Sequence, residues 1–343
     1  RKVLNELLNI AKDPKGKTSD ELLNEAETKI FELSENRSKI DTLKKIDEYV
    51  VQTLDRLDEL SGQEGDLIGL SSGFKAVDGI TQGLQDEDLI VVAGRPSMGK
   101  TSFAMNIAEN VAKSEDGCVA VFSLEMSSQS LTARMMASMA GISQQNVKGA
   151  NLTDRQWEKI VKQSAKLKEL DIYIDDTANI SPIEIRAKAR RLAKQYRDKG
   201  GLNLVVIDYI QLMQMPGRTE NRVNELSDIS RALKGLAKEV KAPVIVLSQL
   251  NRGVEQRPNK RPQMSDLRDS GAIEQDADLI FMLYRDWVYN KNEEYKSVAE
   301  LNLVKHRNGP TNKVLLSFRD ELTRFGDLAP EIMNSYAQDR TED

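Results

Sequence analysis

Gly94-Arg-Pro-Ser-Met-Gly-Lys-Thr101 fits the pattern of a phosphate-binding loop, in which glycines precede a lysine and a hydroxyl residue. Glycines let backbone N–H groups approach phosphate oxygens, and a helix that follows the loop presents its positive end to the anion. The apolar run Leu89-Ile-Val-Val-Ala93 comes directly before the loop, and a helical pattern begins at Lys100. Because this is the strand, loop and helix order that the pattern requires, the stretch predicts an α/β fold with a nucleotide site.

The residue types of the loop indicate how it would hold a nucleoside triphosphate. We expect Lys100 to bridge the β- and γ-phosphates and the Thr101 hydroxyl to bind Mg²⁺. The other contacts expected from the loop are at Gly94, Ser97, Gly99 and Ser102. The ligand predicted for this site is therefore ATP with Mg²⁺.

Around the loop, apolar runs alternate with helical patterns. Strands are expected at residues 89–93, 119–123, 172–175, 204–208 and 244–248. Ser181-Pro-Ile-Glu184 is a capping box that begins one of the intervening helices. Such alternation predicts a mainly parallel sheet with helices on both faces. After Asp278 the pattern changes to short strands at residues 279–284, 299–306 and 314–318, which we expect to extend the sheet antiparallel at one edge.

The N-terminal part of the chain has a different pattern. Apolar residues recur at three or four positions between residues 19 and 36, which predicts one amphipathic helix. The polar stretch Ser61-Gly-Gln-Glu-Gly65 resembles a linker, so we predict a helical linker region at residues 1–64 and an ATPase domain at residues 65–343. Because residue 1 is an arginine inside an apparent helix, we expect the chain to be part of a longer polypeptide.

Composition excludes several classes of protein. The chain has 343 residues, 39% of them apolar, and no apolar run approaches the roughly 20 residues of a membrane helix. The single cysteine, Cys118, lies in an apolar run and is expected to be a buried strand thiol, so neither disulfides nor zinc fingers are expected within this chain. A net charge of −5 argues against a uniformly basic coat, so any nucleic-acid contact must be confined to particular loops.

Polar residues at the ends of three predicted strands are candidates for the chemistry, because the carboxyl ends of parallel strands converge on the phosphate loop. Asp208 is expected to hold the metal, and Glu125 to orient and deprotonate the attacking water. Gln249 could touch the γ-phosphate and sense its loss. The alternatives are a solvated loop aspartate, a surface glutamate and an amide without a role.

Two further groups of basic residues are candidates. The long, mostly unperiodic stretch from residue 251 to 276 contains Arg252, Arg257, Lys260, Arg261 and Arg268 and is a plausible DNA contact, although acidic neighbours also allow a solvated loop. Lys305 and Arg307 flank the only histidine, His306, on a predicted strand, so both are expected on one face, aimed at one anion. The alternative for this pair is an exposed, charged edge strand.

Seven strings of the sequence follow one another along the chain. They are Ala93-Gly-Arg-Pro-Ser-Met-Gly-Lys-Thr101, Phe122-Ser-Leu-Glu-Met126, Ile207-Asp-Tyr-Ile-Gln-Leu-Met213, Leu247-Ser-Gln-Leu-Asn-Arg252, Asp266-Leu-Arg-Asp-Ser-Gly271, Ile273-Glu-Gln-Asp-Ala-Asp278 and Lys305-His-Arg-Asn-Gly-Pro310. In this order and spacing they closely resemble the motifs of the DnaB family of bacterial replicative helicases. Only the first is generic. The resemblance implies a RecA-like core, preceded by the family's linker helix and, before it, a globular N-terminal domain that is missing from this sequence.

The resemblance also implies roles for individual residues. It gives Lys100, Thr101, Glu125, Asp208 and Gln249 the roles expected above. It further implies that Arg307 is an arginine finger with Lys305 as its companion, both reaching the ATP of a neighbouring subunit, and that Arg134 helps to position the nucleotide. The DNA contacts that it implies are Arg268, Asp269 and Gly271.

At the level of the whole protein, the resemblance implies an ATP-driven helicase. The expected assembly is a homohexamer that moves 5′ to 3′ on single-stranded DNA in the cytoplasm, at the replication fork, with a primase and a helicase loader as partners. The main rival is a RecA-type strand-pairing or repair ATPase, and a small-molecule kinase is a second alternative. The linker helix and the string around His306 favour the helicase.

Overall fold

The structure is a computed structural model that describes residues 45–61, 67–215 and 221–338, with residues 8, 12, 22 and 26 as isolated points. The chain divides into two compact units, residues 1–65 and 66–343. In the first unit the structure describes helix α3 (Ile46–Ser61). The linker helix predicted at residues 19–36 lies outside the described residues apart from two points, and both it and the predicted domain boundary stay predictions.

Among residues 67–215 and 221–338, nine strands form one sheet. In sheet order they are β3 (Ile172–Asp175), β2 (Cys118–Ser123), β4 (Leu202–Asp208), β5 (Val244–Gln249), β1 (Leu89–Gly94), β6 (Leu279–Tyr284), β7 (Val298–His306), β8 (Asn312–Arg319) and β9 (Arg324–Asp327). Every pair from β3 to β6 is parallel, and the pairs from β6 to β9 are antiparallel. The predicted mainly parallel sheet with antiparallel edge strands is confirmed.

One detail of the predicted edge is wrong. The strand at residues 279–284, expected to be antiparallel, pairs parallel with β1, so that Ile90 lies opposite Leu279. It reaches this direction because residues 250–278 cross back to the amino ends of the parallel strands before β6 begins. All six residues of β6 are buried, as expected for a strand covered on both faces.

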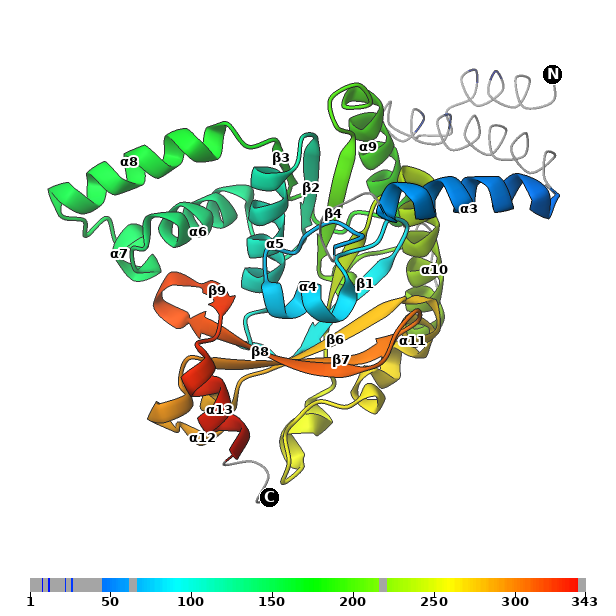
Figure 1. Ribbon diagram of the computed structural model, residues 1–343. Coiled ribbons are helices and arrows are strands. Elements are labelled where there is room, and N and C mark those ends of the chain that lie inside the picture. Colours follow the sequence, from blue (N-terminus) through cyan, green and yellow to red (C-terminus); the bar gives the residue numbers. More distant parts are fainter. Residues whose placement is uncertain are drawn as a thin grey trace. The chain divides into compact units, whose positions relative to one another are not determined.

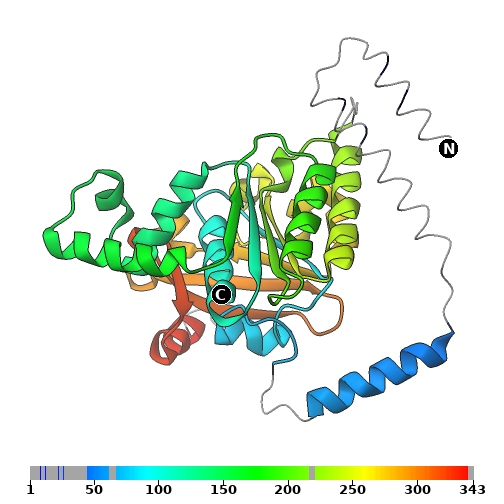
Figure 2. The same ribbon diagram turned by 90° about the horizontal axis from the view of Figure 1, so that it is seen from above.

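Helices cover both faces of the sheet (Figure 1). Their bounds are α4 (Lys75–Thr81), α5 (Lys100–Ser114), α6 (Ser128–Ala140), α7 (Gln144–Lys148), α8 (Asp154–Lys168), α9 (Pro182–Gln195), α10 (Arg222–Val240), α11 (Gly271–Asp276), α12 (Asp286–Asn290) and α13 (Pro330–Gln338). The core therefore has two layers, one with apolar residues of α4 and α5 and one with those of α9 and α10. Viewed from above, the cyan helix α5 and the yellow-green helix α10 lie on opposite sides of the strands (Figure 2).

Local signals read from the sequence account for several element ends. The predicted capping box begins α9, where Ser181 N–H donates to Glu184 Oε2 (2.8 Å) and Glu184 N–H donates to Ser181 Oγ (3.3 Å). Cys118 is buried in β2 as expected, and burial raises the pKa of its thiol to about 12. Within the described ranges, every helix is too short or too polar to cross a lipid bilayer.

The stretch from residue 251 to 276, expected to lack periodic structure, contains three short helices. They are η2 (Arg252–Gln256), η3 (Met264–Ser270) and α11. Leu250, Val254, Leu267 and Ile273 anchor them in the core layer of α9 and α10. Turns this short carry too few apolar positions to show a period in the sequence.

Candidate active site

The phosphate loop joins β1 to α5 at the carboxyl edge of the parallel strands. Gly99, the residue before the helix, has φ 98°, and a Cβ at this position would lie 3.1 Å from the ring of Phe325. Both facts require glycine here. Gly99 offers no side-chain cap, so the first N–H groups of α5, from Lys100 to Ser102, are available to an anion.

Lys100 lies within this loop with its amine close to the loop backbone. Its Nζ donates to the carbonyl oxygen of Arg95 across 3.2 Å. Burial lowers the pKa of Lys100 to about 8, although Asp208 and Glu125 nearby act in the opposite direction. A phosphate beside the amine would restore its charge, because an opposite charge favours the protonated form.

Thr101 and Asp208 meet at the other side of the loop. The Thr101 hydroxyl donates to Asp208 Oδ2 across 2.8 Å, and Asp208 is buried with 4% of its surface exposed. Burial raises the pKa of this carboxyl, and the charge of Glu125 raises it further. Both groups are oxygen ligands of the kind that Mg²⁺ prefers, and a cation would offset the cost of burying the carboxylate, so the pair fits this metal. Within the described residues, no cluster of three or more His, Cys, Asp or Glu side chains offers another metal site.

Glu125 is exposed just beyond the end of β2. Ser123, the last residue of that strand, lies opposite Asp208, and Leu124 N–H donates to the Asp208 carbonyl across 2.7 Å. The charge of Glu125 acts on both Lys100 and Asp208, which places its carboxylate in the same site. An exposed carboxylate facing the phosphate loop is able to reach a water molecule beside a bound nucleotide.

Gln249 ends β5 directly beside the loop, in register with Gly94. The side chain of Gln211, a residue given no role from the sequence, binds the backbone of Gln249. Gln211 Nε2 donates to the Gln249 carbonyl (3.1 Å) and to Ser248 Oγ (3.0 Å), while Gln211 Oε1 accepts from Gln249 N–H (3.2 Å). The signal that could have found Gln211 is a polar residue three positions after β4, the strand that borders β5.

Arg134, on α6, borders the same site. It lines a small cavity with Thr101 and Ser102, and its charge acts on Asp208. Among the described residues, its buried Nε has no hydrogen-bond partner. An orphaned guanidinium donor next to the phosphate loop fits an anionic group of a bound nucleotide, since buried donors are rarely left unpaired.

Ser97 lies at the tip of the loop with φ 68°. Its carbonyl accepts from Arg285 Nη1 (3.2 Å), and the guanidinium of Arg285 lies 4.3 Å from the centre of the Phe318 ring. Arg285 follows β6 and was not singled out from the sequence. Its hydrogen bond to the Ser97 carbonyl holds the backbone of the loop.

Lys305 and Arg307 lie near the start of β1 and β6, at the edge of the sheet opposite to the phosphate loop. Lys305 Nζ donates to the carbonyls of Glu274 and Ala277 (2.6 Å each), and Arg307 Nη1 lies 3.0 Å from Asp278 Oδ1. Both cations also contact the Gln275 carbonyl, so they do share one side, as expected. Burial, followed by the charge of Arg307, lowers the pKa of Lys305.

The length of β1 separates Lys305 and Arg307 from the phosphate loop of their own chain. Asp278 N–H donates to the Leu89 carbonyl at the start of β1, whereas the loop begins at Gly94, where β1 ends. Five steps along a strand span roughly 16 Å at about 3.3 Å per residue. Lys305 and Arg307 therefore face away from their own nucleotide site.

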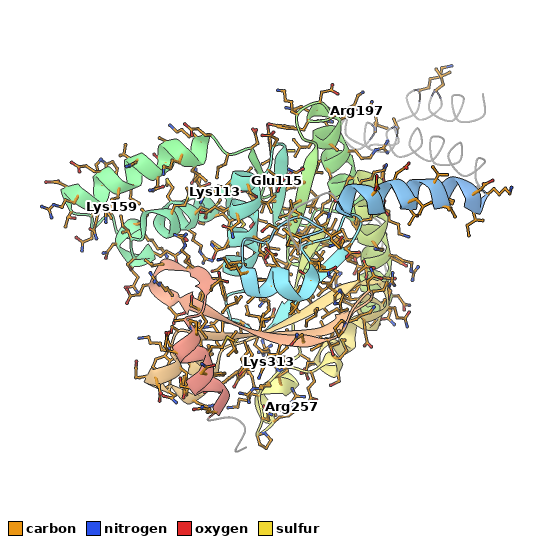
Figure 3. The ribbon with its side chains drawn as sticks, in the orientation of Figure 1. Lys113, Glu115, Lys159, Arg197, Arg257 and Lys313 are labelled. Atoms are coloured by element: carbon orange, nitrogen blue, oxygen red, sulfur yellow. The ribbon has the colours of Figure 1, made fainter. Side chains whose placement is uncertain are left out.

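The candidate DNA segment is only partly described. The side chains of Arg268 and Asp269 lie outside the described residues, and Gly271 is exposed at the start of α11. Arg257, labelled in Figure 3, pairs with Asp266 (2.7 Å), and Arg261 pairs with the buried Glu300 (2.9 Å). Arg261 thus ties the segment to the core, Arg257 links two parts of the segment to each other, and the DNA contact stays a prediction.

Comparison with known proteins adds a family and its relatives. Residues 69–327 match the family described as the DnaB-like helicase C terminal domain. The replicative DNA helicase DnaB of Pasteurella multocida (strain Pm70) is 46% identical in a match that covers 96% of this chain and 73% of that protein. The replicative DNA helicase DnaB of Geobacillus stearothermophilus is 48% identical over 310 residues, or 90% of this chain and 67% of that protein.

Two solved structures share the fold. One, described as an ATPase domain, superposes with a TM-score of 0.78 at 37% identity, covering 84% of this chain and 100% of that one. A DnaB-like replicative helicase, described with its interactions with primase, superposes with a TM-score of 0.79 at 34% identity, covering 95% of this chain and 76% of that one. The RecA-like ATPase core expected from the sequence is thereby confirmed.

Proposed function

The chain belongs to the family of DnaB-like replicative helicases, which are ATP-dependent DNA helicases, and from this premise we propose how its residues perform the reaction. The proposal is an ATP-driven motor that moves 5′ to 3′ on single-stranded DNA as a homohexameric ring. The observation that carries it is the position of Arg307. Arg307 pairs with Asp278, just before β6 begins, whereas the phosphate loop follows the far end of β1, the strand parallel to β6. A complete site therefore needs two copies of the chain.

Nucleotide binding follows from the loop and its neighbours. The free N–H groups at the start of α5 and the Lys100 amine would contact the β- and γ-phosphates, and Arg134 would contact the nucleotide from α6. Mg²⁺ held by Thr101 and Asp208 would neutralise part of the charge on the β- and γ-phosphate oxygens. Ser97 and Gly94 shape the loop around the phosphates.

Hydrolysis is an in-line attack of water on the γ-phosphorus. Glu125 orients the water and accepts its proton as the new P–O bond forms and the bond to the β-phosphate oxygen breaks. Lys100 keeps its positive charge against the oxygens on which negative charge develops. Gln249, whose backbone is held by Gln211, lies beside Gly94, and its side chain would sense the γ-phosphate.

A neighbouring subunit completes the site. Arg307 of one chain reaches the nucleotide of the next, with Lys305 beside it. A guanidinium has five N–H donors, so contacts with Asp278 and Gln275 do not exhaust it. Such a head-to-tail contact is heterologous, and its repetition closes a ring, which is the geometry that a hexamer uses.

Single-stranded DNA would follow the segment from Arg268 to Gly271 inside the ring. Contacts through backbone N–H groups would explain how a chain with a net charge of −5 holds a polyanion. We assign its action to the cytoplasm, at the replication fork, with a primase and a helicase loader as partners. A primase interaction is described for one of the structural relatives.

An unwinding assay on forked DNA tests the proposal. Forks that carry only a 5′ tail, only a 3′ tail, or both are incubated with and without ATP, with the Lys100→Ala variant as control. Unwinding is expected only with ATP and only on forks that carry a 5′ tail, because a motor that moves 5′ to 3′ loads on that strand. Strand pairing without unwinding would instead favour the RecA-type alternative.

A further inference from the structure

One arginine of the phosphate loop extends away from the nucleotide and into the segment that carries the candidate DNA contacts. Arg95 is 7% exposed and lies directly after Gly94. Its Nη1 donates to the Leu250 carbonyl (2.7 Å), and its Nε and Nη2 both lie 2.9 Å from Glu255 Oε1. These contacts of one buried guanidinium join the loop to Leu250 and to η2, 155 and 160 residues further along the chain.

The same residue also holds the lysine that binds phosphate. The Arg95 carbonyl accepts from Lys100 Nζ (3.2 Å), so a phosphate that draws the amine away acts directly on the backbone of Arg95. The Arg95 side chain would carry that displacement to Glu255. Charged, hydrogen-bonded pairs transmit such shifts because their geometry is narrow.

From Glu255 the contacts continue to η3. Asn251 N–H, at the start of η2, donates to the Asp266 carbonyl (3.1 Å). Arg257, just after η2, pairs with the Asp266 carboxylate (2.7 Å), which also accepts from Gln263 N–H (2.7 Å). Asp266 lies within η3, the helix that includes positions 268–270.

Close packing does not offer an equally direct route. A cavity of about 400 Å³ separates the loop from η3, and its lining includes Arg95, Gln211, Gln249, Asn251 and Asp266. A void transmits little, because side chains across it do not touch. Leu250, just before η2, contacts the loop through its carbonyl, which accepts from Arg95 Nη1 (2.7 Å), and through its N–H, which donates to the Gly94 carbonyl (3.4 Å). The Arg95–Glu255 pair is the side-chain contact that reaches η2 itself.

We propose that Arg95 and Glu255 are the positioning pair through which nucleotide in the phosphate loop sets the affinity of the η2–η3 segment for single-stranded DNA. The inference rests on the proposed function, since it takes that segment as the DNA contact. Coupling between two ligands is reciprocal, so it is measured at equilibrium as one ratio of affinities.

The test compares the affinity for a labelled oligothymidylate in the presence of Mg²⁺ with a non-hydrolysable ATP analogue and with ADP. The ratio of the two affinities is the coupling. Glu255→Ala removes the acceptor of Arg95, whereas Glu255→Gln keeps a neutral one. Loss of a negative charge near DNA changes both affinities alike, so it cancels in the ratio.

The expected result is graded. Glu255→Ala lowers the ratio by about fivefold or more, the lower end of typical allosteric coupling, and Glu255→Gln lies between it and wild type. ATP turnover without DNA stays near wild type, because Glu255 does not touch the phosphate loop except through the Arg95 side chain. The melting temperature falls in Glu255→Ala, because the buried Arg95 guanidinium loses its carboxylate, and falls less in Glu255→Gln. Arg95→Gln combined with Glu255→Ala lowers the ratio no further than either change alone, as expected for two members of one pair.

Glu239→Ala is the matched control. Glu239 on α10 pairs with Arg186 and Arg190 on α9, and its side chain is 24% exposed, but these pairs do not touch the loop. A wild-type ratio in Glu255→Ala, or an equal loss in Glu239→Ala, overturns the inference. Wild-type protein that does not bind the oligonucleotide at all overturns the proposed function, whereas wild-type binding with a ratio of one overturns only the inference.

Discussion

The Thr101 hydroxyl donates a 2.8 Å hydrogen bond to Asp208 Oδ2 and thereby ties the first turn of α5 to the end of β4. The two oxygen groups that we propose as magnesium ligands are therefore already together in the protein. Because burial raises the pKa of Asp208, the carboxylate is costly to keep charged until a cation arrives.

Asp208→Asn separates the charge of this residue from its shape. The amide oxygen can still accept from Thr101, so the fold and nucleotide binding without Mg²⁺ should change little. Hydrolysis should fall by about a hundredfold or more, the usual effect of losing an electrostatic group that acts on the transition state. Turnover and nucleotide affinity across a magnesium titration provide the measurement, and a magnesium dependence equal to that of wild type would contradict the assignment.

The lowered pKa of Lys100, about 8, predicts a pH dependence of nucleotide binding. Phosphate favours the protonated amine, so the pKa of Lys100 is higher in the complex than in the free protein. Affinity should thus be constant below this pKa and fall above it, approaching tenfold per pH unit, with uptake of a proton on binding. Calorimetry at about one pH unit below, at and above this value measures both effects.

Lys100→Arg is the control for this pH dependence. A guanidinium stays protonated throughout the range, so the fall in affinity should disappear even if binding is weaker overall. The same fall in the arginine variant would show that another group is responsible.

The sequence was sufficient for the elements that depend on local pattern. Continuous apolar runs predicted the strands, and the phosphate-loop pattern predicted the strand and helix that lie on either side of the loop, because the pattern depends on residues close together in the chain. Strand ends then brought Asp208 and Gln249 to the loop, since parallel strands share an edge.

What the sequence could not show depends on distant pairs. Arg261 pairs with Glu300 and Gln211 with Ser248, at separations of 39 and 37 residues, and a single sequence does not reveal such partners. The parallel direction of β6 was missed for a related reason. An apolar run of six residues looks the same in either direction, and its direction depends on the path of the segment before it.

Glu125→Gln should separate binding from chemistry. The change removes a base and no phosphate contact, so nucleotide affinity should be kept while turnover falls by about 10²- to 10⁴-fold. Glu115→Gln is a matched control, because Glu115 is also exposed but lies at the other end of α5 (Figure 3). Lost affinity with an undiminished rate in Glu125→Gln would assign the residue to binding.

Arg307→Ala should abolish most hydrolysis even though the phosphate loop of the same chain is intact. Arginine fingers contribute about 10³- to 10⁵-fold to the rate, and this one faces away from its own loop. Arg319→Ala, at an exposed arginine at the end of β8, is the control and should keep its activity.

Mixed rings decide whether Arg307 acts on its own chain or on the next. Arg307→Ala chains keep the phosphate loop, and Lys100→Ala chains keep the arginine, so neither ring is active alone. In rings assembled from equal amounts of both, about one quarter of the junctions pair an intact loop with an intact arginine, if assembly is random. Turnover should recover toward that fraction in mixtures shown by native mass spectrometry to contain both chains. If Arg307 acted within its own chain, no subunit of the mixture would hold both groups, and co-assembled rings would stay as inactive as either variant alone.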